Sequence, residues 1–226
     1  MIAILDSQLN DFPQPKNADE DGLLAIGGDL SVHRLLTAYQ QGIFPWYNPG
    51  DPICWFSPDP RCVIFPSSLK ISKSMRKLRQ QNVFSYSYNE AFEMLIKHCA
   101  SVDRKDQDGT WISSEMQKAY IELNKLGYAH SIEVWNKENH LVGGLYGVLI
   151  GKIFVGESMF SHESNASKAA LIELAERFDL ELIDCQVPNS HLMSLGATLL
   201  SREEYLNTLS NHTPQAHGLQ KLLRHT

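Results

Sequence analysis

The cysteine and histidine patterns that build metal sites or disulfide frameworks are missing from this sequence. Its four cysteines, at positions 54, 62, 99 and 185, are irregularly spaced and form no CxxC pair, and its nine histidines form no HExxH-like motif. This spacing argues against a zinc site and against a dithiol redox centre. We therefore expect reduced, mostly buried thiols and no bound metal.

Long apolar runs and an excess of positive charge are missing as well. No apolar run reaches the roughly 20 residues of a membrane-spanning helix, and the N-terminus, MIAILDSQLNDFPQP, has no basic region before its short apolar start. The 226 residues carry a formal net charge of −6, which argues against nucleic-acid binding by the whole surface. We expect a cytoplasmic globular protein without membrane contact, in which any nucleic-acid site is a local patch.

Acidic residues are absent from one segment, residues 61–89. Lys70, Lys73 and Lys77 have helical spacing there, which predicts a helix from about Ser68 to Gln80 with a basic stripe. The stripe is either a solvated surface or a contact for nucleic-acid phosphates. The basic residues of the segment are Arg61, Lys70, Lys73, Arg76, Lys77 and Arg79.

Proline and glycine are concentrated in the first sixty residues, where seven of the ten prolines lie between Pro13 and Pro60. One helix is predicted there, with Ser31 as its N-cap and Gly42 as its stop. The aromatic residues that follow form either a small core or a rigid stacking platform for a base; they are Phe44, Trp46, Tyr47, Trp55 and Phe56. The change of composition after Arg61 predicts a small loop-rich domain over residues 1–61 and a second domain over residues 62–226.

The stretch from Leu141 to Gln186 organises the second part. Two apolar runs flank Ile150-Gly151-Lys152, which predicts a tight hairpin, and a helix capped by Asn165 or Ser167 follows. In a short strand over residues 182–187, Asp184 and Gln186 are two positions apart and should share a face, with Cys185 on the other. This polar pair is either a set of satisfied groups at a sheet edge or part of a site.

Other elements complete an α+β pattern. Helices are predicted over residues 89–99, 113–126 and 201–209, a polar loop over 103–109 and a strand over 129–135. The second part then reads strand, strand, strand, helix, strand, a meander with a helix packed on it. This order fits an acyltransferase architecture.

Nine short blocks in this order resemble the leucyl/phenylalanyl-tRNA-protein transferases. The blocks span residues 17–187, and they are NADEDGLLAIGGDLS from Asn17, AYQQGIFPWYNPGDP from Ala38, WFSPDPR from Trp55, GTWIS from Gly109, HSIEVW from His130, GGLYG from Gly143, GESMFS from Gly156, NASKAAL from Asn165 and LIDCQV from Leu182.

The resemblance implies a specific reaction. Leucine or phenylalanine, and methionine less well, would pass from aminoacyl-tRNA to the N-terminal Arg or Lys of a protein and mark it for degradation by the N-end rule pathway. The implied fold is a GNAT-type, N-acetyltransferase-like domain with a small N-terminal domain. The implied partners are Leu-tRNA or Phe-tRNA and the acceptor protein, with no cofactor, and a monomer is expected.

The resemblance also implies roles for individual residues, most of them in the matching blocks. Asp184 and Gln186 would be catalytic, with the Gln186 amide oxygen accepting from the attacking amine and Asp184 polarising the amide from its NH2 side. Glu157 would bind the acceptor. Further implied residues are Trp46 and Trp111 for the adenosine, Phe154, Met159, Leu171 and Ile183 for the aminoacyl pocket, and Lys70, Lys73, Arg76, Lys77 and Arg79 for tRNA phosphates.

The sequence departs from the family pattern at two places, and two alternative functions remain to be compared with the transferase. Leu145 replaces an expected methionine, a volume-conserving change, and the C-terminal tail does not match. An acetyl-CoA-dependent N-acetyltransferase would need a glycine-rich turn at a helix start, and Ser161–Ser167 has no glycine. A non-catalytic tRNA- or peptide-binding adaptor is the other alternative.

Overall fold

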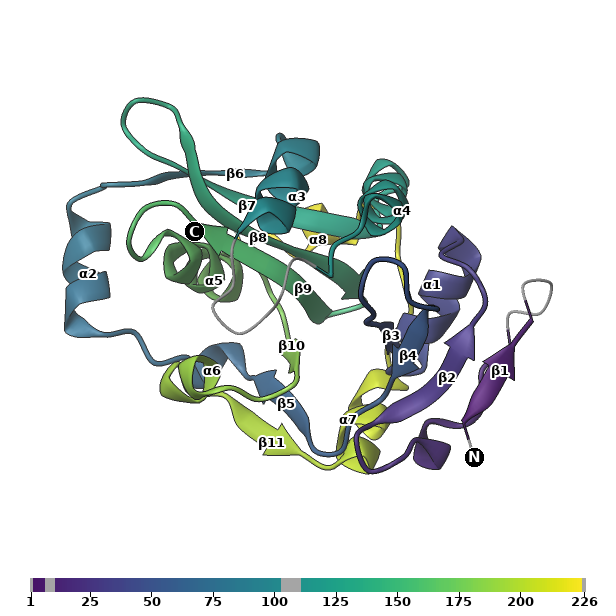
Figure 1. The fold of residues 1–226 in the computed structure, drawn as a ribbon. Helices are drawn as coiled ribbons and strands as arrows, with labels where there is room; N and C mark the ends of the chain where they lie inside the picture. The colour runs from purple at the N-terminus through teal and green to yellow at the C-terminus, as the bar shows by residue number, and fades with distance from the viewer. Residues whose placement is uncertain (1, 7–10, 103–110, 225–226) are drawn as a thin grey trace.

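The computed structural model describes residues 2–6, 11–102 and 111–224. It is a mixed α+β structure with a four-stranded sheet, order β1-β2-β4-β3, beside a seven-stranded sheet, order β11-β5-β10-β9-β8-β7-β6 (Figure 1). None of its helices is long and apolar enough to cross a membrane, as far as the described residues go. The predicted polar loop over 103–109 lies outside those residues.

The smaller sheet corrects the prediction of a loop-rich N-terminal unit. Its strands are β1 (Ala3–Leu5), β2 (Leu23–Gly27), β3 (Phe44–Pro45) and β4 (Cys54–Phe56), and β1 runs parallel to β2. Strands this short carry no readable alternation, so sequence periodicity missed them. The predicted helix is confirmed as α1 (Val32–Gln40), with the Ser31 side chain accepting a hydrogen bond from the Arg34 N–H.

The aromatic loop forms mostly core. Trp55 and Phe44 are buried, whereas Trp46 stays 40% exposed and packs against Phe56 at a ring distance of 5.8 Å. One side chain of the group is therefore available for stacking, and its neighbours hold it in place.

The larger sheet contains the predicted meander. The strands β7 (Ala129–Trp135), β8 (Leu141–Ile150) and β9 (Ile153–Ser161) pair antiparallel in turn. After α5 (Ala166–Arg177), β10 (Leu182–Gln186) returns parallel to β9. The hairpin at Gly151-Lys152 and the strand-strand-strand-helix-strand order are confirmed.

This sheet also contains three strands that were not predicted from the sequence. They are β5 (Arg61–Ile64), β6 (Ser85–Tyr88) and β11 (Thr198–Leu200). β5 pairs antiparallel with both β10 and β11. Arg61, which was counted only as a basic residue, therefore begins a buried strand inside the larger sheet.

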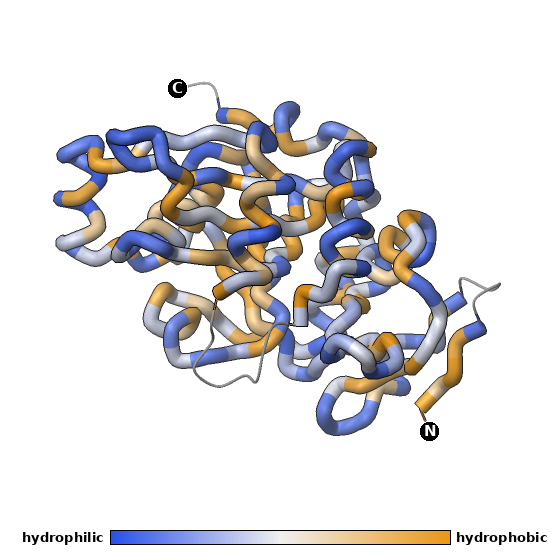
Figure 2. The backbone as a smooth tube through the Cα atoms, turned by 45° about the horizontal axis from the view of Figure 1, so that its top comes forward, coloured by the Kyte–Doolittle hydropathy of each residue, from blue (hydrophilic) through white to orange (hydrophobic). Residues whose placement is uncertain are grey.

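Helices cover both faces of the larger sheet (Figure 1). On β8, Tyr146 and Val148 pack into the cluster that includes residues of α1, α3 (Phe92–Ser101) and α4 (Ser114–Lys125), while Leu145 and Leu149 pack into the cluster of α5. In Figure 2 hydrophobic segments run mainly through the interior and hydrophilic ones mainly along the outside. The first cluster also contains Trp55 from β4, so the core runs without a break past the predicted boundary at residue 61, and the two-domain division stays a prediction.

The C-terminal part adds α6 (Ser190–Ser194), α7 (Arg202–Leu209) and α8 (Gly218–Lys221). The predicted helix over 201–209 is confirmed as α7, which begins with a capping box between Ser201 and Glu204. Thr213 accepts a backbone hydrogen bond from Gly151, so the tail closes over the β8–β9 hairpin.

The basic helix is shorter than predicted. A 3-10 turn, η2 (Pro66–Ser68), comes first, and α2 (Lys73–Gln80) begins after Ser72, whose side chain accepts from the Met75 N–H. Lys70 therefore lies outside the helix, where its N–H donates to the Leu195 carbonyl over 2.8 Å. The helical prediction from Ser68 was wrong because Ser72 supplies the N-cap and the preceding backbone at Leu69 is extended.

Candidate active site

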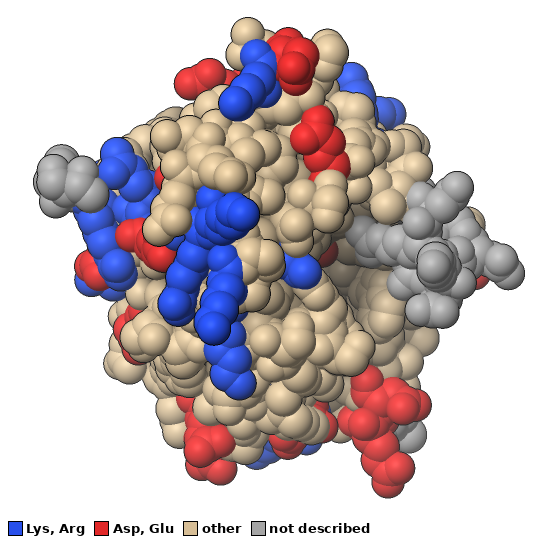
Figure 3. Space-filling view, turned by 90° about the vertical axis from the view of Figure 1, so that its left-hand side faces the viewer, with Lys and Arg blue, Asp and Glu red and all other residues tan. Residues whose placement is uncertain are grey.

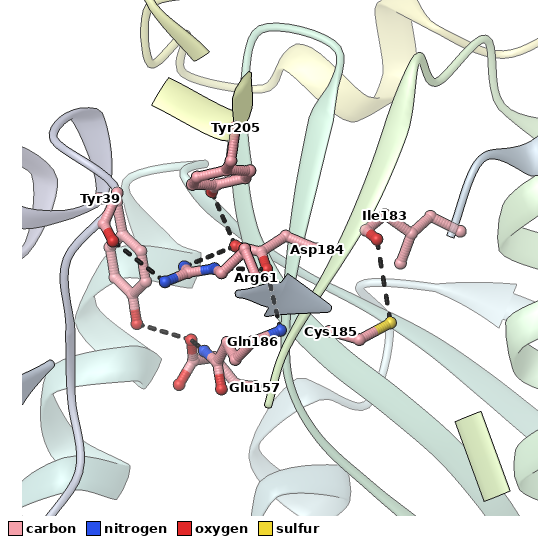
Figure 4. A network of polar contacts seen from close by, with 9 residues as sticks. Tyr39, Arg61, Glu157, Ile183, Asp184, Cys185, Gln186 and Tyr205 are labelled. Atoms are coloured by element: carbon pink, nitrogen blue, oxygen red, sulfur yellow. Dashed lines mark hydrogen bonds and ion pairs between the residues drawn. The ribbon is translucent and has the colours of Figure 1, made fainter. Parts of the chain in front are cut away.

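Two buried carboxylates mark the centre of the larger sheet, where β5, β10 and β9 lie next to one another. Asp184 comes from β10 and Glu157 from β9, and Gln186 at the end of β10 contacts both (Figure 4). Each carboxylate has its own set of partners. Gln186 is the residue that links the two sets.

Asp184 forms a fully buried ion pair with Arg61. The guanidinium donates from Nε to Oδ1 over 2.9 Å and from Nη2 to Oδ2 over 2.7 Å, and the Tyr205 hydroxyl donates to Oδ2 over 2.7 Å. Arg61 also donates to the Gly42 carbonyl and lies over the rings of Phe44 and Tyr205. The guanidinium thus donates two parallel hydrogen bonds, one to each carboxylate oxygen. This bidentate pair fixes the end of β10 against β5.

Glu157 is held by hydroxyl and amide donors. Tyr39 donates to Oε1 over 2.8 Å, Tyr120 donates to Oε2 over 2.9 Å, and the two tyrosine hydroxyls also contact each other. Burial raises the pKa of Glu157 to about 7, against the hydrogen bonds from Tyr39 and Tyr120, which lower it. Burial and the Glu157 charge raise the pKa of both tyrosines. The carboxyl therefore changes its charge near neutral pH while the tyrosines keep their protons.

Gln186 does not form the side-chain pair with Asp184 that the sequence suggested. A β-bulge between Asp184 and Gln186, with φ of 61° at Gln186, turns the end of the strand. Asp184 accepts the Gln186 backbone N–H over 2.9 Å, and the Gln186 side chain donates from Nε2 to Glu157 over 2.9 Å. Glu157 thus occupies the NH2 side of the amide, where Asp184 was expected. The amide oxygen then faces away from Glu157.

The predicted aminoacyl residues come together in one cavity of about 290 Å³. Phe154 and Met159 come from β9, Leu171 from α5 and Ile183 from β10, and Leu145 from β8 also lines the wall. Its walls are mostly aliphatic, with Ser158, Asp184, Asn189 and His191 among them. The cavity can hold one apolar side chain.

The two predicted adenosine residues line a second cavity, of about 210 Å³. Trp46 and Trp111 lie in its wall together with Phe44 and Gln186. The two cavities share Cys185, Asn189 and Leu192. An apolar cavity and an aromatic one therefore adjoin at the end of β10, where Gln186 lies.

The predicted phosphate-binding residues lie on or beside α2 and are mostly exposed. Lys70, Lys73, Arg76 and Lys77 are exposed, while Arg79 is partly covered and forms a 2.6 Å ion pair with Glu176. Figure 3 faces the side of the molecule that carries α2 in Figure 1 and shows Lys and Arg side chains gathered in one group beside a hollow. Lys70, Lys73, Arg76 and Lys77 form no ion pair with another described residue, so they can meet an anion without first breaking one.

Sequence reasoning missed three members of the site. Arg61 and Tyr205 contact Asp184, whereas Tyr39 contacts Glu157. Arg61 and Tyr39 do lie inside the blocks WFSPDPR and AYQQGIFPW, which could have drawn attention to them. Nothing in the local sequence marks Tyr205. Over the described ranges, no three His, Cys, Asp or Glu side chains gather as a metal site would require.

Comparison with known proteins identifies the family. The family model for the leucyl/phenylalanyl-tRNA protein transferase matches residues 63–210, and the model for the N-terminal domain of the same family matches residues 28–59. The chain is also similar to three proteins named leucyl/phenylalanyl-tRNA–protein transferase. The Syntrophobacter fumaroxidans protein is 52% identical over 92% of this chain and 90% of its own length. The Flavobacterium johnsoniae protein is 53% identical over 88% of this chain and 95% of its own length. The Shigella dysenteriae protein is 54% identical over 88% of this chain and 86% of its own length.

Among solved structures, one titled "The structure of L-PGS from Bacillus licheniformis" aligns with 74% of this chain and 54% of its own, at 10% identity and a TM-score of 0.38. A likeness that distant carries no argument about the fold family. The sequence relatives and the family models, which together cover most of the chain, are far closer. The chain belongs to the leucyl/phenylalanyl-tRNA protein transferase family, a family of aminoacyltransferases.

Proposed function

We propose that this protein transfers leucine or phenylalanine, and methionine less well, from aminoacyl-tRNA to the N-terminal Arg or Lys of an acceptor protein. The product carries a new peptide bond and is marked for degradation by the N-end rule pathway. The observation that carries the proposal is the position of Gln186, where the apolar cavity adjoins the Trp46–Trp111 cavity. The family membership supports the same reaction.

The reaction needs an amine, an ester and a way to orient them. The neutral α-amine of the acceptor attacks the carbonyl carbon of the aminoacyl ester, the bond to the ribose oxygen breaks, and the amine proton ends on that oxygen. An N-terminal amine has a pKa of about 8, so a useful fraction is neutral at physiological pH. Positioning can then supply much of the rate.

Gln186 would position the attacking amine. Its NH2 side faces Glu157, so its amide oxygen is the part that can accept a hydrogen bond from the amine. Asp184 acts one step away, because it holds the Gln186 backbone N–H and is itself held by Arg61. We propose Gln186 as a catalytic residue and Asp184 as the residue that fixes it, a change from the direct polarisation expected from sequence.

Glu157 would bind the positive charge of the acceptor. Glu157 keeps 7% of its surface exposed and Asp184 keeps 0%, so Glu157 is the carboxylate that an incoming amine or basic side chain can reach. Arg61 already neutralises Asp184, whereas the described partners of Glu157 are uncharged tyrosines and an amide. An unneutralised buried carboxylate favours a cationic ligand.

The two cavities would hold the end of the aminoacyl-tRNA. The amino acid side chain would enter the cavity of Phe154, Met159, Leu171 and Ile183, and the adenosine would stack between Trp46 and Trp111. An apolar pocket discriminates weakly, since one methylene is worth about 1–3 kcal/mol, and this agrees with use of Leu, Phe and Met. Lys70, Lys73, Arg76 and Lys77 would contact phosphates of the acceptor stem, with Arg79 contributing less while Glu176 pairs with it.

We propose further that residues 62–226 form a GNAT-type acyltransferase-like domain and residues 1–61 a small N-terminal domain, acting as a cytoplasmic monomer without a cofactor. The β7–β8–β9 meander followed by α5 and β10 supports the first of these points. An acetyl-CoA N-acetyltransferase is the less favoured alternative, because the start of α5 offers Asn165 in a left-handed conformation and no glycine-rich turn for a pyrophosphate. A non-catalytic adaptor would leave the Gln186 arrangement without a purpose.

The test is transfer of labelled leucine from Leu-tRNA to a peptide that begins with Arg, beside the same peptide beginning with Ala. We expect transfer to the Arg peptide and little to the Ala peptide. Transfer of an acetyl group from acetyl-CoA in the absence of tRNA would support the acetyltransferase instead. Binding of Leu-tRNA without any transfer would support the adaptor.

A further inference from the structure

The aromatic cavity, which Trp46 and Trp111 line, is built from segments that lie far apart in the sequence. Phe44 on β3 and Gln186 at the end of β10 both belong to its wall. Arg61, at the start of β5, forms hydrogen bonds with the residue two positions before each of them. Because Arg61 is itself only 1% exposed, it can act on a substrate only through the groups that it holds.

Two contacts of Arg61 hold the turn that leads into the aromatic cavity. Its Nη1 donates to the Gly42 carbonyl over 3.1 Å, and its guanidinium carbon lies 4.8 Å from the centre of the Phe44 ring. Gly42 has φ of 71°, and a Cβ at this position would meet the Leu206 side chain on α7 at 2.6 Å. The turn is therefore packed between Arg61 and α7. Since Phe44 and Trp46 follow this turn directly, its position sets the position of their part of the wall.

The other contacts of Arg61 reach Gln186 through Asp184. Arg61 donates to both carboxylate oxygens of Asp184, and Asp184 Oδ1 also accepts the Gln186 backbone N–H over 2.9 Å. Gln186 has φ of 61°, a left-handed backbone that residues other than glycine seldom adopt, and an aspartate that accepts the N–H two residues on favours such a turn. Tyr205 donates to Asp184 Oδ2, and its ring centre lies 4.6 Å from the Arg61 guanidinium carbon (Figure 4). The carboxylate is thus held in one orientation, and the Gln186 backbone with it.

We propose that Arg61 is a positioning residue that sets where Gln186 lies relative to the aromatic cavity. The inference rests on the proposed function, in which this cavity holds the adenosine and Gln186 holds the attacking amine. The bond that breaks joins the aminoacyl carbonyl to the ribose oxygen of that adenosine, so Arg61 would fix the distance between the amine and its ester. Reacting atoms must approach to about 3–3.5 Å, and a misplacement of about 1 Å can cost about a hundredfold in rate.

The variant Arg61→Lys separates positioning from charge. Lysine keeps a positive charge beside Asp184, so the buried carboxylate is not left unpaired. One ammonium nitrogen cannot replace the three guanidinium nitrogens that donate to Asp184 and Gly42, nor the flat group that lies over the Phe44 and Tyr205 rings. Each cavity keeps its own lining residues, while the position of one relative to the other is no longer fixed. We expect kcat for leucine transfer to fall at least tenfold, with KM for an Arg peptide and Kd for Leu-tRNA changed less than threefold.

The experiment is single-turnover transfer by the wild type, Arg61→Lys, Gln186→Ala and the double variant. Because Arg61 would act through Gln186, Arg61→Lys should slow transfer less than threefold in the Gln186→Ala background. A merely structural role would lower the rate by the same factor in both backgrounds. Arg34→Lys is the matched control, since Arg34 is also a buried arginine that pairs with an aspartate, Asp29, and it lies outside the walls of both cavities. It should transfer at the wild-type rate.

Hydrogen exchange of the Gln186 backbone amide, measured by NMR, tests the same point without any transfer. This N–H is bonded to Asp184, so it should exchange slowly in the wild type and in Arg34→Lys. In Arg61→Lys it should exchange at least tenfold faster, while the Ile132 amide in the centre of β7 stays unchanged. If the wild type transfers no leucine but Gln186 still responds in this way, the proposed function fails and the hold of Arg61 on Gln186 is supported.

Tyr205→Phe is a milder variant that serves if Arg61→Lys does not fold. It removes only the hydroxyl that donates to Asp184 and keeps the ring beside Arg61. It should speed exchange at Gln186 and slow transfer at least threefold, again only where Gln186 is present. The proposal is overturned if the folded variant transfers at the wild-type rate, if it slows transfer equally in the Gln186→Ala background, or if it leaves exchange at Gln186 unchanged.

Discussion

Replacement of Glu157 by glutamine tests how the site would recognise its acceptor. The change keeps the shape and leaves an amide oxygen that can accept from Tyr39 and Gln186, while the Tyr120 hydroxyl has to turn and accept from the new NH2 group; the negative charge is removed. Loss of one member of a buried, hydrogen-bonded charge pair costs about 2–5 kcal/mol. Because the amide retains hydrogen bonds, we take about 2 kcal/mol, which raises KM for an Arg peptide about 30-fold.

The assay is steady-state transfer at saturating Leu-tRNA with a varied concentration of the Arg peptide, repeated from pH 6 to pH 8. Burial raises the pKa of Glu157 to about 7, so the carboxyl is negative above that pH and neutral below it. KM of the wild type should therefore rise about tenfold from pH 8 to pH 6. The Glu157→Gln variant should show no such rise. Ionisation of the acceptor amine acts on both proteins alike, so their difference isolates Glu157.

Two results would refute this reasoning. An unchanged KM in Glu157→Gln would mean that the carboxylate does not meet the acceptor's charge. If Glu157→Gln lowered kcat and left KM unchanged, the carboxylate would act after the peptide has bound. Its role would then be only to hold the Gln186 amide.

Three further predictions follow from the other parts of the site. In Arg61→Leu the buried Asp184 loses its counter-ion, so the free energy of unfolding in urea should fall by about 3–5 kcal/mol. The double variant Arg61→Leu with Asp184→Leu should lose at least 2 kcal/mol less of this free energy than the sum of the losses in the two single variants. Lys73→Glu together with Lys77→Glu should weaken tRNA binding and flatten its salt dependence, because fewer phosphates are neutralised. Met159→Trp should fill part of the cavity and reduce the use of Phe-tRNA about tenfold more than that of Leu-tRNA.

The tRNA-binding and donor-preference predictions each have a matched control. Lys118 and Lys125 are exposed on α4, so their double replacement by Glu changes the net charge equally without touching α2. Met94, on α3, is 50% exposed and lies outside the cavity, and Met94→Trp should leave donor preference unchanged. Additive losses of stability in the Arg61–Asp184 cycle would contradict the coupling of this ion pair. A salt dependence of tRNA binding equal to that of the wild type would contradict phosphate binding by Lys73 and Lys77. Equal effects of Met159→Trp on the two donors would contradict the assignment of the apolar cavity to the aminoacyl side chain.

The sequence predicted the elements that are long and regular. The strand over 129–135 agrees with the structure at both ends, and α1 begins after the predicted cap Ser31. Helices α4 and α7 begin one residue after their predicted starts, because periodicity is a local signal. The strands of the N-terminal sheet have two to five residues and pair across the chain. Such pairing leaves no local pattern to read.

The residues of the candidate site were also predictable only where the signal is local in the sequence. Met159, Leu171 and Ile183 of the apolar cavity and the two tryptophans were predicted because they lie in recognisable blocks, and the structure places them in the walls of the two adjoining cavities. The link between Arg61 and Asp184 joins residues 123 positions apart, and it exists because β5 lies next to β10. The bulge that turns Gln186 toward Glu157 is equally non-local, so an ideal two-residue alternation gave the wrong partner for its amide.

The most direct measurement is single-turnover transfer of leucine from Leu-tRNA to an Arg peptide by the wild type and by Gln186→Ala, with tRNA binding measured on the same samples. The account predicts that the wild type adds one leucine to the peptide, and that Gln186→Ala does so at least tenfold more slowly with little loss of tRNA affinity. A Gln186→Ala variant that transfers at the wild-type rate would contradict the central role of this residue.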